Sequence, residues 1–306
     1  MMNNNIQDRW ENRATVRSRS RITFDNNVNG YFFPLSHQPL SVHPKVVELG
    51  KEALHFLLIQ SLYKYSNDIT MIETRVVNQA ILTVTTDALP ITFDSEKKLV
   101  LYTIMVDEAY HAYVAFDAML QVQHHTQVAP LLLPKTSEIE CAIQWAHEKL
   151  PTQYHDIFNL IAVCLAENTV TTEIISMVDK NETHPFFQKM IKDHLSDESR
   201  HAGVFSKLLS YIWQNLDLAC KQALAEILPN FLERYLGLEV RMEFDVQTLM
   251  AMGLSACAAN EVLNDTYKGF KLSKQHPMLK KILFLLETTG VTDDIVLPHL
   301  KEKNWI

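Results

Sequence analysis

Glycine is scarce in this chain, with only 7 among 306 residues. No two glycines fall in a G-x-G arrangement, so the dinucleotide-binding fingerprint and the phosphate-binding P-loop are both absent. A turn-rich β fold also needs many glycines. The abundance of Leu, Ala, Met and Gln instead favours helices.

Cysteine is scarce too, and its four copies, Cys141, Cys164, Cys220 and Cys257, lie far apart in the sequence. The lack of a C-x-x-C pair excludes a zinc ribbon and a thioredoxin-like redox motif. Scattered single cysteines in a chain of this size are typical of reduced core residues. We therefore expect a cytoplasmic protein without disulfides.

Long apolar runs are missing as well. The first 13 residues contain no apolar segment of the kind found in secretory signals. The most apolar stretch, 160–178, is interrupted by Glu167, Asn168 and Glu173. A membrane span normally needs about 18 or more consecutive apolar residues, so we expect none.

An excess of positive charge is the last feature that the chain lacks. It has 28 Lys and Arg against 36 Asp and Glu, for a formal net charge of −8. Nucleic-acid-binding proteins normally present a basic face, so this class is disfavoured. The acidic balance still allows a buried cation that neutralises clustered carboxylates.

The chain divides into a short arm and one long helical domain. Residues 1–44 are polar, punctuated by three prolines and predicted to be irregular. They include a basic RSRSR run at 17–21, and we expect a solvated arm that wraps the body or a partner subunit. Residues 45–306 form a single domain. Apolar spacing and capping signals predict helices over 46–65, 68–89, 95–123, 137–150, 151–180, 185–213, 217–236, 244–270 and 277–288.

Two of these helices carry carboxylates within unusually apolar surroundings. Residues 99–122 contain only Asp107, Glu108 and Asp117 as charged groups, and residues 157–178 contain only Glu167 and Glu173. A helix that is apolar on every face is expected to be buried. A buried carboxylate has to be protonated, paired or bound to a metal, so these helices are where a functional site is expected.

A D-E-x-x-H motif occurs twice, as Asp107-Glu108-x-x-His111 and Asp197-Glu198-x-x-His201. Glu and His three residues apart lie on one face of a helix, where both can bind one ion. Carboxylates can bridge two ions, and imidazole is a suitable ligand for iron. The repeated motif therefore indicates a site for two iron ions.

Each motif also has a lone glutamate upstream, Glu73 before the first and Glu167 before the second. The gap of one helix and a turn brings each lone glutamate level with its motif across an antiparallel helix pair. Four helices that supply four Glu and two His are typical of ferritin-like di-iron carboxylate proteins. We therefore predict an all-α fold, a ferritin-like four-helix bundle with additional flanking helices.

Three further residues extend the predicted site. Asp107 is placed to accept the free imidazole N–H of His201, and Asp197 that of His111, which would fix both imidazoles. His194 lies four residues before Glu198 and seven before His201, on the same helix face. We predict His194 as a seventh ligand, which would leave one iron richer in nitrogen than the other.

In type and order, these seven residues resemble the metal site of the AurF-like di-iron N-oxygenases, the p-aminobenzoate N-oxygenase type. The resemblance covers about residues 45–270. The core of two Glu and two E-x-x-H motifs is shared with other di-iron proteins, and the added His194 points to the AurF-like branch. The ligands it implies are Glu73, Glu108, His111, Glu167, His194, Glu198 and His201.

The resemblance implies an oxygenase that uses O2 to convert an amine to a hydroxylamine, nitroso or nitro product, in secondary-metabolite biosynthesis. It also implies a homodimer and an external electron donor. Glu173, on the same near-apolar helix as Glu167, suggests a cationic or aliphatic amine, although pairing with a basic residue is the simpler interpretation. Tyr65 and Tyr102 are candidates for the substrate pocket, with core packing as the alternative.

Two other classes remain open at this point. One is a different di-iron oxidoreductase, either a desaturase or a radical-generating subunit. The other is a non-enzymatic, ferritin-like iron-binding protein. A radical subunit needs a tyrosine close to the metals, whereas Tyr110 is adjacent to His111 and so points to another side of the helix.

Overall fold

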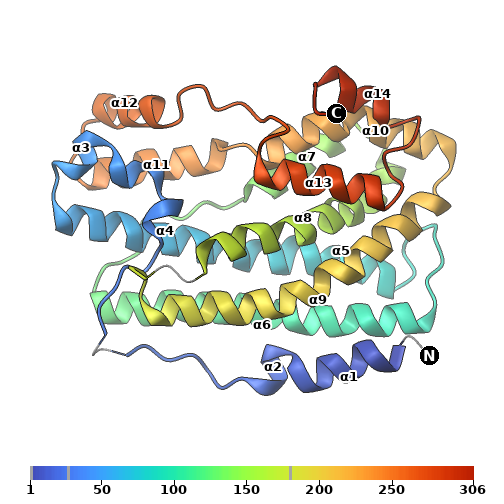
Figure 1. The fold of residues 1–306 in the computed structure, drawn as a ribbon, viewed down its shortest axis with the longest axis horizontal. Helices are drawn as coiled ribbons and strands as arrows, with labels where there is room; N and C mark the ends of the chain where they lie inside the picture. The colour runs from blue at the N-terminus through green and yellow to red at the C-terminus, as the bar shows by residue number, and fades with distance from the viewer. Residues whose placement is uncertain (1–2, 26–27, 179–180) are drawn as a thin grey trace.

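The computed structural model describes residues 3–25, 28–178 and 181–306 (Figure 1). Helices make up most of this part of the chain, and its one β feature is an isolated parallel bridge between Tyr31 and Thr183. The all-α prediction is therefore confirmed.

Four long helical segments form the core and run along the long axis of the molecule (Figure 1). The first contacts the second and the third contacts the fourth, while further contacts join the two pairs. This is the predicted ferritin-like arrangement. The segments are α4 (Lys51–Met71) continued by the π-helical η3 (Ile72–Val77) and α5 (Asn78–Thr85), then α6 (Ser95–Thr126), α8 (His155–Met177) and α9 (Pro185–Asn215).

The predicted helix starts follow ordinary capping chemistry. The Asp94 side chain accepts a hydrogen bond from the backbone N–H of Lys97 at 2.7 Å and caps α6. Ser137 and Glu140 form a reciprocal capping box at the start of α7 (Glu138–His147). Pro185 is the first residue of α9, where its missing N–H costs nothing.

Two predicted helix boundaries are wrong. The segments 46–65 and 68–89 belong largely to one continuous helical segment, because η3 carries the chain from α4 into α5 without a break. The segment 244–270 is instead two helices, α11 (Glu239–Ala251) and α12 (Ala256–Thr266). Gly253, with φ of 100° in the left-handed region, turns the chain between them, and Ser255 caps α12.

The described part of the N-terminal arm is only partly irregular, which corrects the prediction for residues 1–44. It contains α1 (Asn3–Arg13), α2 (Thr15–Ser18) and the 3-10 turns η1 (Leu35–His37) and η2 (Pro39–Val42). Figure 1 shows α1 and α2 lying along α6, and both helices contact it. A short polar helix is marginal in isolation, so these contacts account for its stability.

The basic run of the arm is used in ion pairs with the body. Arg19 lies 3.5 Å from Asp193, and the guanidinium of Arg21 lies 2.7 Å from the carboxylate of Asp117. The arm therefore lies on the helical body, held there by charges of opposite sign.

The remaining helices cover the opposite side of the core (Figure 1). In this layer α10 packs on α7, and α13 packs on α8. Its members not yet named are α10 (Leu218–Tyr235), α13 (Pro277–Thr288), α14 (Leu297–Glu302), α3 (Pro44–Val47) and the 3-10 turn η4 (Thr152–Tyr154). The layer shields α8, the most apolar core helix.

The stretch Thr152–Met177 is the one helix among the described residues that is long and apolar enough to cross a membrane, and 67% of its apolar window is buried within the protein. This burial is typical of a core helix.

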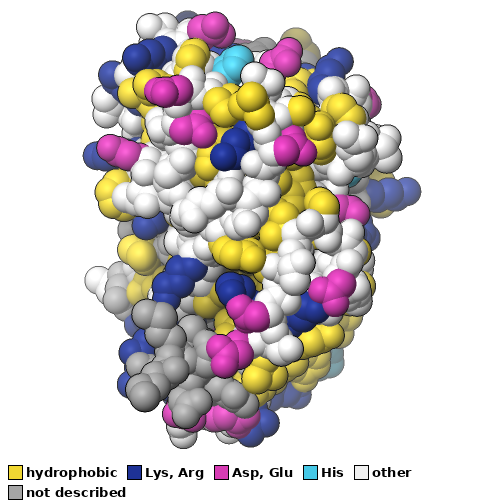
Figure 2. Space-filling model, turned by 90° about the vertical axis from the view of Figure 1, so that its right-hand side faces the viewer, with side chains coloured by type: hydrophobic (Ala, Val, Ile, Leu, Met, Phe, Trp, Pro, Cys, Tyr) yellow, Lys and Arg dark blue, Asp and Glu magenta, His cyan; other side chains and the backbone are white. Residues whose placement is uncertain are grey.

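Figure 2 shows one end of the bundle, where acidic and basic side chains are interspersed rather than gathered by sign. All four cysteines are free, but Cys141 and Cys257 are exposed, so only Cys164 and Cys220 fit the expected core position.

Helix α6 is not buried on every face, which corrects the expectation for residues 99–122. Six large apolar side chains on it are between 45% and 53% exposed: Leu99, Tyr102, Val106, Tyr113, Phe116 and Leu120. Their spacing alternates between three and four residues with one gap, which the exposed Ala109 fills. They therefore form one continuous stripe on the outside of the molecule, named here the α6 stripe.

Candidate metal centre

The four core segments bring all seven predicted ligand residues to one place in the bundle interior. Glu73 comes from η3, Glu108 and His111 from α6, and Glu167 from α8. His194, Glu198 and His201 come from successive turns of α9. All seven side chains are buried, the most exposed being His194 at 6%.

Glu73 lies in the π-helical segment η3, and the other six ligand candidates lie in α-helices. A π segment contains one extra residue in a turn, which changes the direction of the side chains after it and is common at functional sites. Here it falls at the level of the cluster. Sequence periodicity at 3.6 residues per turn places Glu73 only approximately, because it does not register this insertion.

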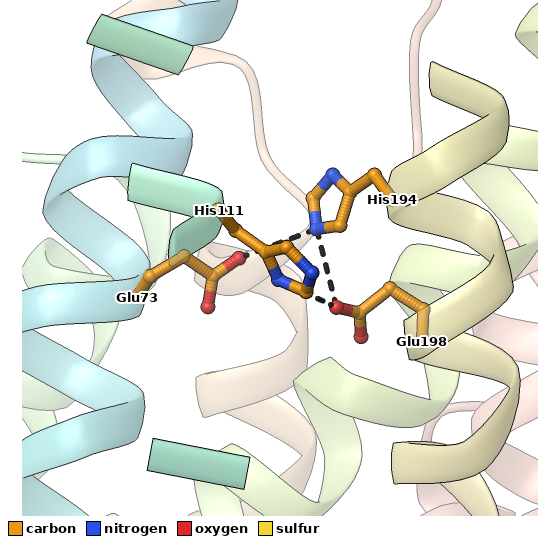
Figure 3. Close-up of side chains that lie close together, drawn as sticks. All are labelled: Glu73, His111, His194 and Glu198. Atoms are coloured by element: carbon orange, nitrogen blue, oxygen red, sulfur yellow. Dashed lines mark ion pairs between the residues drawn. The ribbon is translucent and has the colours of Figure 1, made fainter. Parts of the chain in front are cut away.

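The seven residues sort into two groups of potential ligand atoms that share Glu198. In each group the atoms lie within 4.8 Å of one another, close enough to surround one ion. One group contains Glu73, His111, His194 and Glu198 (Figure 3), and the other contains Glu108, Glu167, Glu198 and His201. The first group holds two imidazoles and the second holds one, which is the asymmetry expected from His194.

Around the first position, His194 Nε2 lies 3.1 Å from Glu198 Oε1 and 3.7 Å from Glu73 Oε1. His111 Nδ1 lies 3.3 Å from the same Glu198 oxygen. Figure 3 shows these groups converging from η3, α6 and α9 on one point. Two imidazole nitrogens and two carboxylates therefore face a common space.

Glu108 lies between the two halves of the site. One of its oxygens lies 2.7 Å from His111 Nδ1, and the other lies 2.8 Å from His201 Nδ1. Glu198 also faces both halves, with Oε1 at 3.5 Å from His201 Nδ1. Glu108 and Glu198 are thus positioned as bridges, whereas Glu73 and Glu167 each belong to one side.

The outer nitrogens of two imidazoles are bound by the aspartates of the opposite motifs. His201 Nε2 lies 3.1 Å from Asp107 Oδ2, and His111 Nε2 lies 3.2 Å from Asp197 Oδ2. These are the two cross-pairs expected from the sequence. Donation of each Nε2–H to a carboxylate leaves Nδ1 directed at the centre of the cluster.

Arg200 joins the two aspartates. Its guanidinium donates to Asp197 Oδ1 at 2.6 Å and to Asp107 Oδ2 at 2.7 Å. The N-terminal arm completes the network, because the Trp10 indole N–H donates to Asp107 at 2.9 Å and the Thr15 hydroxyl donates to Asp197 at 2.5 Å. Both buried carboxylates therefore have several donors and one shared cation.

The pKa values in the cluster are shifted because several carboxylates are buried together away from water. Burial, the Glu198 carboxylate and the Glu108 carboxylate raise the pKa of Glu167 well above its usual value. Burial would also raise the pKa of Glu198, but the nearby imidazoles of His201 and His194 hold it well below its usual range. Burial works against an imidazolium at His201, yet Glu108 and Glu198 raise the pKa of that group. A positive charge placed among these carboxylates would therefore stabilise the cluster.

Seven atoms of the cluster are buried and have no hydrogen-bond partner among the described residues. They are Glu73 Oε2, Glu108 Oε1, Glu167 Oε2, both oxygens of Glu198, His194 Nε2 and His201 Nδ1. Buried polar atoms are normally satisfied, so this concentration needs an explanation. Carboxylate oxygens and imidazole nitrogens directed at a shared space fit divalent iron, whose charge would supply what the cluster lacks.

A cavity of about 320 Å³ reaches the cluster beside Glu73 and Glu167. Its walls combine apolar and aromatic side chains, including Phe33, Ile72 and Phe244, with several charged groups. A mostly apolar cavity with a few polar groups is the usual form of a small-molecule site. It is large enough for a substrate of a few heavy atoms and ends at the predicted metal ligands.

The three predicted pocket residues have different outcomes. Tyr65 and Glu173 line the cavity. Tyr102 does not: it lies on the outer face of α6, 47% exposed, as part of the α6 stripe. Tyr102 lies two turns before Ala109 of that stripe, on the face opposite the buried Ile104. Its assignment to the pocket is therefore wrong.

Sequence reasoning missed four residues that shape the site. Arg200 lies inside the second motif, directly before His201, and its position three residues after Asp197 is a usable signal. Trp10 and Thr15 give no such signal, because they contact residues 97 and 182 positions away. Arg241 lines the cavity from α11, a helix that carries no motif.

A helical bundle whose core directs four glutamates and three histidines at one space has the architecture of the di-iron carboxylate proteins. The sequence matches the model of the p-aminobenzoate N-oxygenase AurF family over residues 4–267. The chain therefore belongs to this family, which is a family of di-iron oxygenases. No curated protein matches the chain.

The match begins at residue 4 rather than near residue 45. It therefore includes the arm, which contributes Trp10 and Thr15 to the aspartates beside the site. The resemblance is accordingly broader than the motif-bearing helices indicate.

Proposed function

We propose that this chain binds two iron ions and uses O2 to oxygenate the nitrogen of an amine. The observation that carries the proposal is the pair of buried ligand groups that share Glu198. Glu73, His111 and His194 would hold one ion and Glu167 and His201 the other, and Glu108 and Glu198 lie where each could contact both. Family membership supports both the metal and the reaction class.

In the proposed reaction, one oxygen atom of O2 forms the N–O bond of a hydroxylamine and the other leaves as water. The step requires two electrons and two protons, which an external electron donor and solvent supply. Iron, when bound, provides the redox chemistry that activates O2. Further rounds of the same type would give nitroso and nitro products.

The chain's own residues contribute position and environment. Asp107 and Asp197 hold the imidazoles of His201 and His111 in one orientation through their Nε2 atoms. The cavity beside Glu73 and Glu167 holds the substrate and limits access of water. Fixing the amine nitrogen close to the ions lowers the entropic part of the barrier.

We also propose that the chain acts as a homodimer that pairs through the α6 stripe. Apolar residues spaced alternately by three and four are typical of a helix that packs against another helix. The stripe runs from Leu99 to Leu120, and its large side chains are about half exposed. A second copy of the same helix would match this spacing.

The test of the proposed function is anaerobic loading with Fe(II), followed by labelled O2 and a panel of aryl and aliphatic amines. Mass spectrometry should show one labelled oxygen atom on the nitrogen of a product. The Glu108→Ala protein is the matched control, and it should form no such product while keeping its helical circular dichroism. Label taken from water instead of O2 would contradict the proposal.

Two other di-iron functions remain as outcomes of the same experiment. A stable tyrosyl radical signal after aerobic loading would indicate a radical-generating subunit. Accumulation of hundreds of irons per assembly would indicate storage. Membership in an oxygenase family disfavours both.

A further inference from the structure

More carboxyl groups than permanent cations line the cavity that reaches the cluster. Apart from the cluster itself, the described residues that line it include four carboxylates, Asp68, Glu138, Glu173 and Asp245, but only two permanent cations, Lys64 and Arg241. A cavity that contains an excess of one charge favours ligands of the other sign.

Both cations are already engaged. Lys64 Nζ lies 2.6 Å from Asp68 and 3.5 Å from Glu138, so it serves two carboxylates. The guanidinium of Arg241 donates to the backbone carbonyl of His37 at 2.6 Å and lies 3.8 Å from Asp245. Neither cation is left as an evident partner for a substrate carboxylate.

Glu173 is the carboxylate without a partner. Its side chain makes no hydrogen bond or ion pair with any residue in the described part of the chain, and Arg241 and Lys64 influence it only from longer range. Glu173 is partly buried, and desolvation raises the pKa of its carboxyl group. A cation bound beside Glu173 would favour the charged form of its carboxyl group.

Two aromatic rings line the same cavity as Glu173. Tyr65 and Tyr235 line the same cavity, and the Glu173 charge contributes to the raised pKa of both phenols. The hydroxyl of Tyr235 is 2.7 Å from that of Thr169, which fixes one of these rings. Aromatic faces attract organic cations, so the rings and the carboxylate favour the same kind of ligand.

Glu173 also lies at a useful distance from the cluster. It is six residues after Glu167 on α8, which is a rise of about 9 Å along the helix axis. A short aliphatic chain can span this distance. One end would then lie at the cluster and the other at Glu173.

From these features we propose that Glu173 binds a second positive charge on the substrate, so that the enzyme acts on one end of an aliphatic amine whose other end is cationic. This inference rests on the proposed function, because the oxidised amine is placed at the iron site. Lys64 and Arg241 hold the surrounding carboxylates in place. Glu173 is then the carboxylate that binds the positive charge of the substrate.

The experiment uses three primary amines of similar length that differ at the far end. Cadaverine ends in an ammonium group, hexylamine in a methyl group and ε-aminocaproate in a carboxylate. Each is titrated by calorimetry into the iron(II) protein under anaerobic conditions, so that binding is measured without turnover. Cadaverine should bind at least about tenfold more tightly than hexylamine, with ε-aminocaproate weakest.

The Glu173→Gln variant should lose the preference for cadaverine and leave hexylamine binding almost unchanged. Glu173→Asp should retain part of the preference. Glu226→Gln, which removes an exposed carboxylate on α10 outside the cavity, is the control of equal charge and should behave as wild type. If the Gln variant weakens all three ligands equally, or if ε-aminocaproate binds best to the wild type, the inference is wrong.

The two proposals can fail separately. A protein that holds two irons and oxidises amines without regard to the far-end charge would overturn the role of Glu173 alone. A protein that prefers cadaverine but holds no iron pair would overturn the proposed function and leave the cation site in place.

Discussion

At the scale of single residues, the cluster places function in conflict with stability. Glu73, Glu108, Glu167 and Glu198 are buried within a few ångströms of one another, and most of their unpartnered oxygens face inward. Uncompensated buried charges of one sign cost several kcal/mol. A bound cation pair removes this cost, so the metal should contribute strongly to the stability of the loaded protein.

Removing one carboxylate should therefore affect the metal-free and loaded proteins in opposite directions. Glu167→Gln should stabilise the metal-free protein by about 1–3 kcal/mol, because one source of repulsion is lost. The same change should lower the melting temperature of the iron-loaded protein relative to loaded wild type. Calorimetric melting with and without chelator measures both. Destabilisation of the metal-free form would show that Glu167 has a structural role instead.

His194 distinguishes a seven-ligand site from a six-ligand site. It belongs to the same ligand group as Glu73 and His111. His194→Ala should therefore weaken the binding of one ion selectively and reduce bound iron from two per chain toward one. Elemental analysis after gel filtration gives the stoichiometry. His124→Ala, at an exposed position near the end of α6, is the control. Full iron content in the His194 variant would reduce this histidine to a packing role.

At the scale of elements, the site depends on contacts between segments far apart in the sequence. Helix α1 contributes Trp10 and helix α2 contributes Thr15 to aspartates on α6 and α9, and Arg200 links those aspartates. The arm is therefore a part of the site's support. The family match also includes the arm.

Arg200 should be the most sensitive residue of that network. Arg200→Met leaves Asp107 and Asp197 facing each other without their shared cation, which should cost about 3 kcal/mol. Chemical denaturation followed by circular dichroism measures the loss. Lys207→Met, which removes an exposed cation from the same helix, should change stability by less than about 0.5 kcal/mol. Equal effects of the two variants would contradict the network's importance.

The elements also show what the sequence could predict. The ligands can be predicted from the sequence because metal binding restricts residue type and spacing within one helix, as in Glu108 with His111. Two features could not be predicted, because both depend on backbone geometry that apolar spacing does not encode. One is the π segment that joins 46–65 to 68–89, and the other is the break at Gly253. The helical arm was missed for a related reason, since its stability comes from tertiary contacts rather than from its own composition.

At the scale of the whole molecule, the α6 stripe is the main feature that a single chain leaves unexplained. The sequence indicated a helix buried on all sides, whereas one chain covers only the inner faces. A second copy would cover the rest. The metal site lies on the inner face of the same helix, so pairing through α6 would also brace Glu108 and His111.

Charges placed in the stripe should separate the proposed dimer. Tyr113→Asp combined with Phe116→Asp should shift the sedimentation coefficient from that of a dimer to that of a monomer, because the charges cannot be buried unpaired. The iron content of each chain should remain close to two. Leu132→Asp, at an exposed apolar residue outside the stripe, should leave the assembly intact. A wild-type protein that sediments as a monomer would contradict the interface.

The most direct test of the central claim is the metal content of the purified chain after anaerobic titration with Fe(II) and removal of excess metal. Two buried ligand groups joined by Glu198 and Glu108 predict two tightly held irons per chain and fewer in Glu108→Ala. A wild-type value of one or none, or an unchanged value in the variant, would contradict the account.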